Sequence, residues 1–154
     1  MPDTTPTVFV TSASGNQGSS LCYELRKLGW NVRATTRDLG SSAAQALQAA
    51  GVNLTLGSWD DEDALRKGLE GCEKLFLCLL PNLADFEQAP RRAALIARLA
   101  KEAGVSHAIA STTLGAFAVE PGFVPPVKIG PFFDGHVHSK KRVEQAVVDE
   151  GFAY

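Results

Sequence analysis

The chain has 154 residues and a formal net charge of −2 at pH 7, with 45% hydrophobic and 21% charged residues. This length fits one domain of ordinary size, and the composition is typical of a soluble globular protein. Without a basic excess there is no electrostatic support for nucleic-acid binding. The longest apolar run, residues 75–80, is far shorter than the roughly 20 residues that span a bilayer, so no membrane contact is expected.

The N-terminus and the cysteines both favour a reducing compartment. The first six residues lack a basic segment followed by an apolar one, so we expect no signal peptide and a cytoplasmic protein. Cys22, Cys72 and Cys78 are odd in number and show no paired spacing. We expect reduced, mostly buried thiols and no metal site.

Strand-like and helix-like segments alternate along the chain. The expected strands cover residues 7–11, 31–36, 53–56, 74–80 and 107–111. The expected helices cover residues 17–28, 42–50, 60–69, 85–103 and 137–150. Asp60 is the expected N-cap of the third helix, and Pro90 marks either the start of the fourth or a kink in it. Residues 115–135 are expected to form a loop, and a sixth strand would begin at Phe152.

This alternation predicts the fold class. Strands separated by helices form parallel sheets that are covered on both faces. We therefore predict a doubly wound α/β domain, Rossmann-like, with strand order 3-2-1-4-5. It would occupy residues 1–154 without a separate substrate domain and end before the sixth strand.

The first strand runs into a turn of small residues, which consists of Ser12, Ala13, Ser14, Gly15, Asn16, Gln17 and Gly18. Small residues let the backbone approach phosphate oxygens, and N–H groups at the start of the following helix point at them. Because strand, turn, helix and second strand all follow in order, we predict that this turn binds a dinucleotide pyrophosphate. The alternative is an ordinary strand-to-helix turn.

The second strand is followed by Arg37. An arginine here suits the 2′-phosphate that distinguishes NADP from NAD, whereas an acidic residue would hold a ribose hydroxyl. We therefore predict NADP as the cofactor, with Thr36 and Asp38 lining the same site. The alternative for Arg37 is a solvated surface side chain.

Two further segments end at the same edge of the predicted sheet. Ligands of open α/β sheets bind outside the carboxyl ends of the strands, at the switch in strand order. Leu79, Leu80 and Pro81 close the fourth strand, so we expect them beside the ribose and nicotinamide. Residues 111–113 end the fifth strand, where a hydroxyl group of these residues can polarise the carbonyl of a substrate. The alternative is that these residues only cap the end of the strand.

Four segments resemble the NmrA-like family of atypical short-chain dehydrogenases/reductases: residues 11–18, 33–38, 57–61 and 139–144, in the family's order. The resemblance covers nearly the whole chain and implies NADP(H) binding. Some members reduce small substrates, and others have lost catalysis and act as redox-sensing regulators of transcription factors. The resemblance also implies that the second half of a typical member, with the sixth and seventh strands and most of the substrate lobe, is missing.

The resemblance assigns roles on the adenine side. Ser12 stands where the family usually has glycine, which puts the pyrophosphate packing in question. Ser58 stands where the family usually has an aspartate beside the adenine. Ser58 and Trp59 follow the third strand, where the family places its adenine wall, and a tryptophan there can stack on the base or serve the core or an interface.

On the reactive side, Lys140 occupies the place of the family lysine that reaches the nicotinamide ribose. An ammonium there can hold a ribose hydroxyl and lower the pKa of a neighbouring acid. The alternative is that Lys140 is one charge of a solvated stripe formed by residues 140–142. His136 lies one helical turn earlier, where tyrosine-dependent relatives carry the general acid, and it can donate a proton near neutral pH. An exposed loop histidine is its alternative. Tyr23 and Tyr154 are not in that place, which argues against ordinary short-chain dehydrogenase chemistry.

These observations predict an NADP-dependent oxidoreductase that acts on a small carbonyl or quinone-like substrate, in a secondary-metabolite pathway. Two alternatives remain open. One is a non-catalytic NADP(H)-binding redox sensor that binds a regulatory protein partner, which the missing tyrosine and short chain favour. The other is an inactive truncated product whose uncovered strand edge and apolar helix faces would favour a homo-oligomer.

Overall fold

The computed structural model describes residues 5–113 and 130–152. The strands in this part of the chain are β1 (Thr7–Val10), β2 (Asn31–Thr36), β3 (Asn53–Leu56), β4 (Lys74–Leu77) and β5 (His107–Ala110). They alternate with the helices α1 (Asn16–Lys27), α2 (Ser42–Ala49), α3 (Glu62–Leu69), α4 (Gln88–Glu102) and α5 (Pro131–Asp149).

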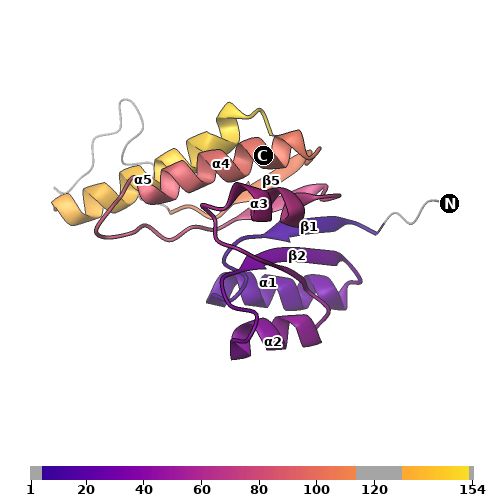
Figure 1. Cartoon of the computed structure of the whole chain (residues 1–154). Coiled ribbons are helices and arrows are strands. Elements are labelled where there is room, and N and C mark those ends of the chain that lie inside the picture. Colours follow the sequence, from indigo (N-terminus) through magenta and orange to yellow (C-terminus); the bar gives the residue numbers. More distant parts are fainter. Residues whose placement is uncertain (1–4, 114–129, 153–154) are drawn as a thin grey trace.

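The strands form one parallel sheet in the order β3-β2-β1-β4-β5, which confirms the predicted topology. Figure 1 shows α1 and α2 on one side of this sheet and α3, α4 and α5 on the other. β1 is central: Phe9 pairs with Arg33 of β2 and with Leu75 of β4. The chain builds the sheet outward from β1 through β2 to β3 and then crosses back to place β4 on the other side of β1. The boundary between β1 and β4 is therefore the switch point, where such folds bind ligands.

The side chains of β1 build a core on each face of the sheet. Phe9 belongs to the cluster under α3, α4 and α5, where Leu65 and Ile96 are also fully buried. Val8 and Val10 belong to the opposite cluster, with Cys22 of α1. Successive side chains of a strand alternate between faces, so an apolar strand such as β1 fits only where both faces are covered.

Several predicted boundaries are corrected by local contacts. The N-cap of α3 is Asp61, whose Oδ1 accepts a hydrogen bond from the Ala64 N–H at 3.0 Å; it is not Asp60, which pairs with Arg92 instead. β4 ends at Leu77 and not at residue 80. α4 begins at Gln88, so Pro90 lies in its first turn, where a missing N–H breaks no intrahelical bond.

The last helix was predicted too short. α5 begins at Pro131, a favoured residue at a first helical position, so residues 131–135 of the expected loop are helical and His136 lies inside a helix. The remainder of that loop, residues 115–129, lies outside the described residues. Phe152 follows α5 and is buried, but residues 153–154 of the expected sixth strand are also outside the described part.

The three cysteines are free and buried, as predicted. Burial raises the pKa of Cys22 to about 12 and that of Cys72 to about 11, so both remain thiols at neutral pH. Over the described ranges no helix combines the length and apolar character that a bilayer crossing needs, and no group of His, Cys, Asp and Glu is arranged to hold a metal ion.

Candidate functional site

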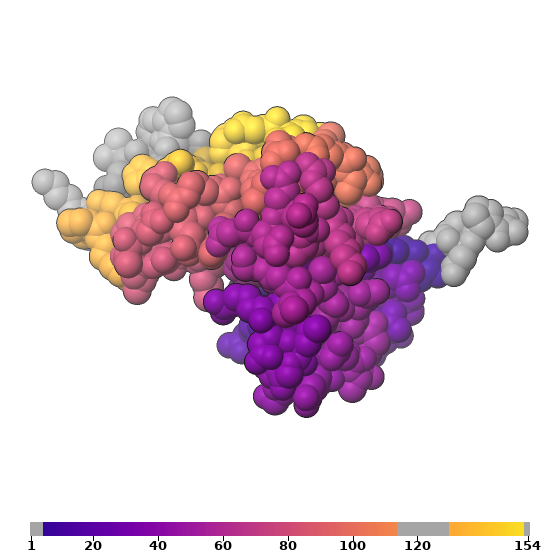
Figure 2. Space-filling view, viewed as in Figure 1, coloured from indigo at the N-terminus to yellow at the C-terminus, as the bar shows by residue number. Residues whose placement is uncertain are grey.

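A cleft of about 650 Å³ opens at the carboxyl ends of β1, β2 and β3. Four parts of the chain line it: the turn from Ser12 to Gly18, residues 35–38 with Ser41, residues 57–59, and the trio Cys78, Leu80 and Arg92. Figure 2 shows this edge of the molecule hollowed between the lobe that holds α1 and α2 and the overhang of α4 and α5. The cleft lies at the switch point where the sequence places the ligand.

The cleft brings together many residues predicted from separate segments. All seven turn residues line it, as do Arg37, Asp38, Ser58, Trp59 and Leu80. Leu79, Pro81, His136 and Lys140 are not part of its lining. The side chain of Leu79 is 1% exposed and packs in the core, so only its backbone is placed to act at this edge.

Hydroxyl groups anchor the turn to the end of β4. Ser12 has a φ of 51°, a left-handed conformation that costs a non-glycine residue roughly 1–2 kcal/mol. Its Oγ donates to the Cys78 carbonyl at 2.6 Å. Thr11 Oγ1 donates to the same carbonyl at 3.1 Å and accepts from the Cys78 N–H at 2.7 Å. These bonds stabilise, at Ser12, a left-handed backbone conformation that glycine would adopt without strain.

Gly18 lets α1 lie directly on this turn. A Cβ at Gly18 would be 2.1 Å from the Ser12 carbonyl oxygen, and one at Gly15 would be 3.3 Å from the same atom. The close approach therefore requires glycine at position 18. This is the packing role of the last glycine in dinucleotide-binding turns.

The N-terminus of α1 is open toward the cleft. Its N-cap is Gly15, no side chain of the described residues caps it, and its first turn holds no acidic residue. In contrast, Ser41 caps α2 and Asp61 caps α3. The first N–H groups of a helix have no intrahelical partner, and here they line a cleft, so they suit an anion such as a pyrophosphate.

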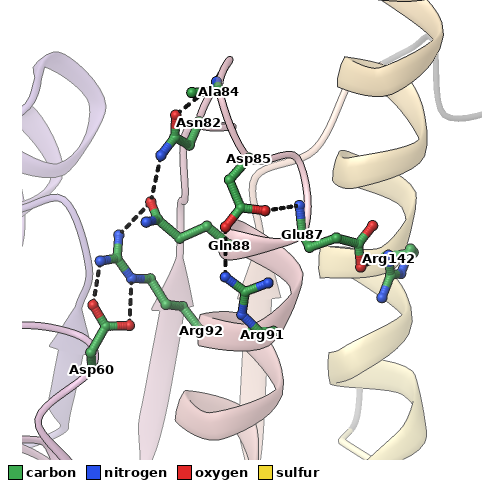
Figure 3. Close-up of polar contacts among 9 residues, drawn as sticks. All are labelled: Asp60, Asn82, Ala84, Asp85, Glu87, Gln88, Arg91, Arg92 and Arg142. Carbon is green, nitrogen blue, oxygen red and sulfur yellow. Dashed lines mark hydrogen bonds and ion pairs between the residues drawn. The ribbon is translucent and has the colours of Figure 1, made fainter.

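Arg37 and Arg92 both line the cleft but differ in their partners. Arg37 is exposed and makes no hydrogen bond or ion pair with any residue that the structure describes. Arg92 donates from Nε and Nη2 to the two carboxylate oxygens of Asp60, the Nε bond being 2.9 Å, and from Nη1 to Gln88 at 3.0 Å (Figure 3). Arg37 is thus the arginine with donors available for a phosphate.

The Asp60–Arg92 pair holds the wall at the β3 end of the cleft. The Arg92 guanidinium lies 5.9 Å from the centre of the Trp59 ring. Its hydrogen bond to Asp60 lowers the pKa of that carboxyl, so the pair stays ionised at neutral pH. Ser58 Oγ accepts from the Asp60 N–H at 3.2 Å. Ser58 and Trp59 therefore occupy a fixed position beside the ligand space.

Lys140 lies beneath the surface of the same edge. It is 6% exposed, and its Nζ donates to the carbonyls of Leu79 at 2.7 Å and Ser111 at 3.4 Å. Burial lowers its pKa, and the nearby Cys78 acts in the opposite direction. The lysine is therefore not part of a solvated charged stripe. His136 lies one turn earlier in α5, half-buried beside Phe133, with ring centres 6.4 Å apart.

Contacts between distant segments, and one further lining residue, were not predicted from the sequence. Gln17 Oε1 accepts from Ser111 Oγ at 2.8 Å and from the Cys78 thiol at 3.7 Å. Arg92 was not predicted to line the cleft at all. No local pattern marks either contact, because 94 residues separate Gln17 from Ser111.

Tyr23 and Lys27 have the spacing of a short-chain dehydrogenase pair, but they lie in α1 outside the cleft lining.

Comparison with known proteins agrees with this architecture. The model of the NmrA-like family matches residues 4–154. The chain belongs to the NmrA-like family. An NAD(P)H azoreductase of Xenophilus azovorans is 33% identical over 114 residues, which are 74% of this chain and 38% of that protein. An NmrA-like family domain-containing oxidoreductase of Aspergillus hancockii is 32% identical over 117 residues, 73% of this chain and 35% of that protein.

A solved structure extends the similarity to three dimensions. The structure of NmrA, a negative transcriptional regulator, in complex with NADP matches with a TM-score of 0.74 and 26% identity. The match covers 96% of this chain and 43% of that one. The chain thus spans less than half the length of these relatives.

Proposed function

We propose that this NmrA-like chain binds NADP(H) in the cleft. The observation that carries the proposal is the pairing, in one cleft, of an uncapped helix N-terminus with an arginine that has no partner among the described residues. The turn from Ser12 to Gly18 would hold the pyrophosphate, and Arg37 would hold the 2′-phosphate. Trp59, fixed by Arg92, would form the adenine wall. The NmrA–NADP structure supports this ligand.

The residues present fit such a cofactor. Gly18 lets α1 lie against the turn, where a Cβ would meet the Ser12 carbonyl oxygen, and the α1 N-terminus supplies N–H donors for a doubly charged pyrophosphate. Lys140 lies at the same edge, where carbonyls engage two of its three N–H groups, and among the described residues the third has no partner and would serve a ribose hydroxyl. Bound NADPH supplies a hydride, and the protein contributes orientation and electrostatics.

We further propose that the protein is an NADP-dependent oxidoreductase for a small carbonyl or quinone-like substrate. The azoreductase and the fungal oxidoreductase among its relatives support this class of reaction. Secondary-metabolite biosynthesis is the proposed setting, on the strength of the family resemblance. Lys140 and His136 are the proposed residues on the reactive side.

A redox sensor is the second candidate. Two observations favour it: Lys140 is held by backbone carbonyls and is absent from the cleft lining, and the chain resembles a negative transcriptional regulator. In this reading the cofactor binds in the same cleft, and its occupancy changes affinity for a protein partner. NADPH turnover separates the two candidates.

The first test is a titration with NADPH and NADH, followed by nucleotide and tryptophan fluorescence. We expect NADPH to bind more tightly, and Arg37→Glu to weaken NADPH roughly 100-fold, because a charge-assisted contact of about 1.5–3 kcal/mol is lost and a repulsion is added. NADH binding should change little. Lys27→Glu, at the exposed far end of α1, controls for the change in charge.

Equal affinity for both nucleotides, or an Arg37→Glu variant that binds like the parent protein, would contradict the NADP assignment. If NADPH binds, its oxidation is then followed with a panel of carbonyl and quinone substrates. Turnover supports the oxidoreductase, whereas binding without turnover of any panel member favours the sensor.

A further inference from the structure

Gln17 connects the phosphate-binding turn to the Lys140 region. It is the second residue of α1, and its Oε1 accepts from Ser111 Oγ, which follows β5, and from Cys78 Sγ, which follows β4. The Ser111 carbonyl in turn accepts from Lys140 Nζ. The side chain of Gln17 therefore crosses the end of β4, from the turn that lines the cleft to the strand end beside the lysine.

The two ends of the Gln17 carboxamide have different surroundings. Both a hydroxyl and a thiol donate to Oε1, which fixes that atom on the side of Ser111. The Nε2 group makes no hydrogen bond with any residue in the described ranges, although Gln17 is exposed and lines the cleft. An amide held by its oxygen thus presents two N–H donors at the ligand space.

A bound NADP must pass this position if the proposed function holds. Its adenine half would lie toward Arg37 and Trp59, and its pyrophosphate on the α1 N-terminus. Lys140 lies on the other side of Gln17, so the nicotinamide half must run past the Gln17 amide to approach the lysine. Phosphate, ribose and carboxamide oxygens in that half are all hydrogen-bond acceptors.

We infer that Gln17 binds the nicotinamide half of the cofactor through its Nε2 group, and that Ser111 is a positioning residue that holds the Gln17 amide in this orientation. The inference rests on the proposed function. It assigns Gln17 a contact through its side chain, beyond the backbone contacts that the turn makes with the pyrophosphate. It also assigns Ser111 a role other than polarising a substrate carbonyl.

The test compares NADPH with 2′,5′-ADP, which carries the adenine half and the 2′-phosphate but no nicotinamide. Isothermal titration is performed on the parent protein, Gln17→Met, Gln17→Glu, Ser111→Ala and the double variant Gln17→Met/Ser111→Ala. Methionine keeps the length of the side chain without its amide. Gln45→Met, on the exposed face of α2 and outside the cleft lining, is the matched control.

We expect Gln17→Met to weaken NADPH roughly tenfold, as for the loss of one hydrogen bond, and to leave 2′,5′-ADP within about twofold. Gln17→Glu should weaken NADPH further, because it replaces the N–H donors with a charged oxygen. Ser111→Ala should weaken NADPH by a smaller factor, and the double variant should be no weaker than Gln17→Met, since Ser111 acts through Gln17. Unchanged 2′,5′-ADP binding shows that each variant retains a folded cleft.

Three outcomes would overturn the inference. They are an unchanged NADPH affinity in Gln17→Met, an equal loss for both ligands, and additive losses in the double variant. Failure of the parent protein to bind 2′,5′-ADP would instead contradict the proposed function itself, so the two failures are distinguishable.

Discussion

The two ends of the carboxyl edge of the sheet are built differently. At the phosphate end, the middle of the turn, residues 14–17, and Arg37 are exposed, and the donors of α1 and Arg37 face a cleft without partners in the described structure. At the lysine end, Lys140 is 6% exposed and bonded to two backbone carbonyls. One end offers its donors to an external anion, and at the other end backbone carbonyls already engage two of the three N–H groups of the ammonium.

This difference separates binding from reaction. A buried ammonium needs hydrogen-bond acceptors, and Lys140 obtains them from residues directly after β4 and β5. A ligand that reaches Lys140 therefore finds one N–H of the ammonium not engaged by these carbonyls, whereas a ligand at the phosphate end finds the first N–H groups of α1 and the Arg37 guanidinium without partners in the described structure. Substitutions that alter one end at a time test this difference.

The largest effect is expected for Gly18→Ala. The new Cβ would be 2.1 Å from the Ser12 carbonyl oxygen, so α1 or the turn must move. We expect a loss of about 3 kcal/mol in the free energy of unfolding, at the upper end of overpacking effects. NADPH binding should fall at least as much as in Arg37→Glu. Urea unfolding and titration measure both, and Ser20→Ala on the exposed face of α1 is the control. A Gly18→Ala protein with parental stability would contradict the close packing.

Gly15→Asp tests whether the open end of α1 is reserved for a ligand. Gly15 has an extended conformation, φ −87° and ψ 171°, which aspartate adopts, and its carboxylate would cap α1 as Asp61 caps α3. The carboxylate should add about 0.5–1 kcal/mol as a cap and with the helix dipole, and the new Cβ, 3.3 Å from the Ser12 carbonyl oxygen, should offset much of it, so the stability of the free protein should stay within about 1 kcal/mol of the parent. NADPH should bind roughly 100-fold more weakly, because the carboxylate takes the donors and repels phosphate. Thermal unfolding should therefore change little while titration shows the loss of affinity; unchanged NADPH affinity would show that the phosphates bind elsewhere.

Sequence reasoning predicted the fold, and it predicted that the turn and Arg37 lie at one site, because both depend on local patterns. The alternation of apolar strands with helices fixes the parallel order, and the turn with Arg37 lies within one strand–helix–strand unit. Element ends were less predictable. Asp60 and Asp61 are both suitable caps, and only the start of α3 at Glu62 decides that Asp61 is used while Asp60 pairs with Arg92.

The lysine end was only partly predictable, for a physical reason. Its geometry depends on contacts between segments that are far apart in the chain, such as Lys140 with Leu79 and Ser111 with Gln17. The sequence predicts that Leu79 lies at this edge but not that its side chain packs into the core while its carbonyl holds Lys140. The position of a residue after a strand predicts that it lies at the carboxyl edge of the sheet. Packing against neighbouring strands and helices determines whether its side chain or its backbone carbonyl is exposed at that edge.

Lys140→Met tests the lysine end directly. Methionine fills a similar volume but donates no hydrogen bond. If the remaining N–H of Lys140 binds the nicotinamide ribose, the variant should bind NADPH roughly tenfold more weakly and 2′,5′-ADP equally well. Titration with the two ligands measures the split. An equal change in both affinities would place the effect on the fold and not on the ribose.

The same variant gives a pH dependence of stability. Burial lowers the pKa of Lys140 in the folded protein below the ordinary 10.5, so between these two values the unfolded chain holds more protons than the folded one. The free energy of unfolding should therefore rise with pH across that window, and the desolvation penalty should persist below it. We expect the parent protein to gain stability relative to Lys140→Met as the pH approaches 10.5. A pH-independent difference in urea unfolding would contradict the lowered pKa.

The smallest effect is expected at Ser12, where the turn differs from a glycine turn. Ser12→Ala keeps the strained φ of 51° but loses the bond to the Cys78 carbonyl, so it should cost about 1 kcal/mol. Ser12→Gly loses the same bond but relieves the strain, which offsets much of the cost. Urea unfolding should rank the parent protein and the glycine variant above the alanine variant. NADPH affinity should stay within about twofold in the glycine variant, because the backbone path is kept. An alanine variant as stable as the parent protein would show that the Ser12 hydroxyl does not hold the turn, and that packing of Gly18 against it is sufficient.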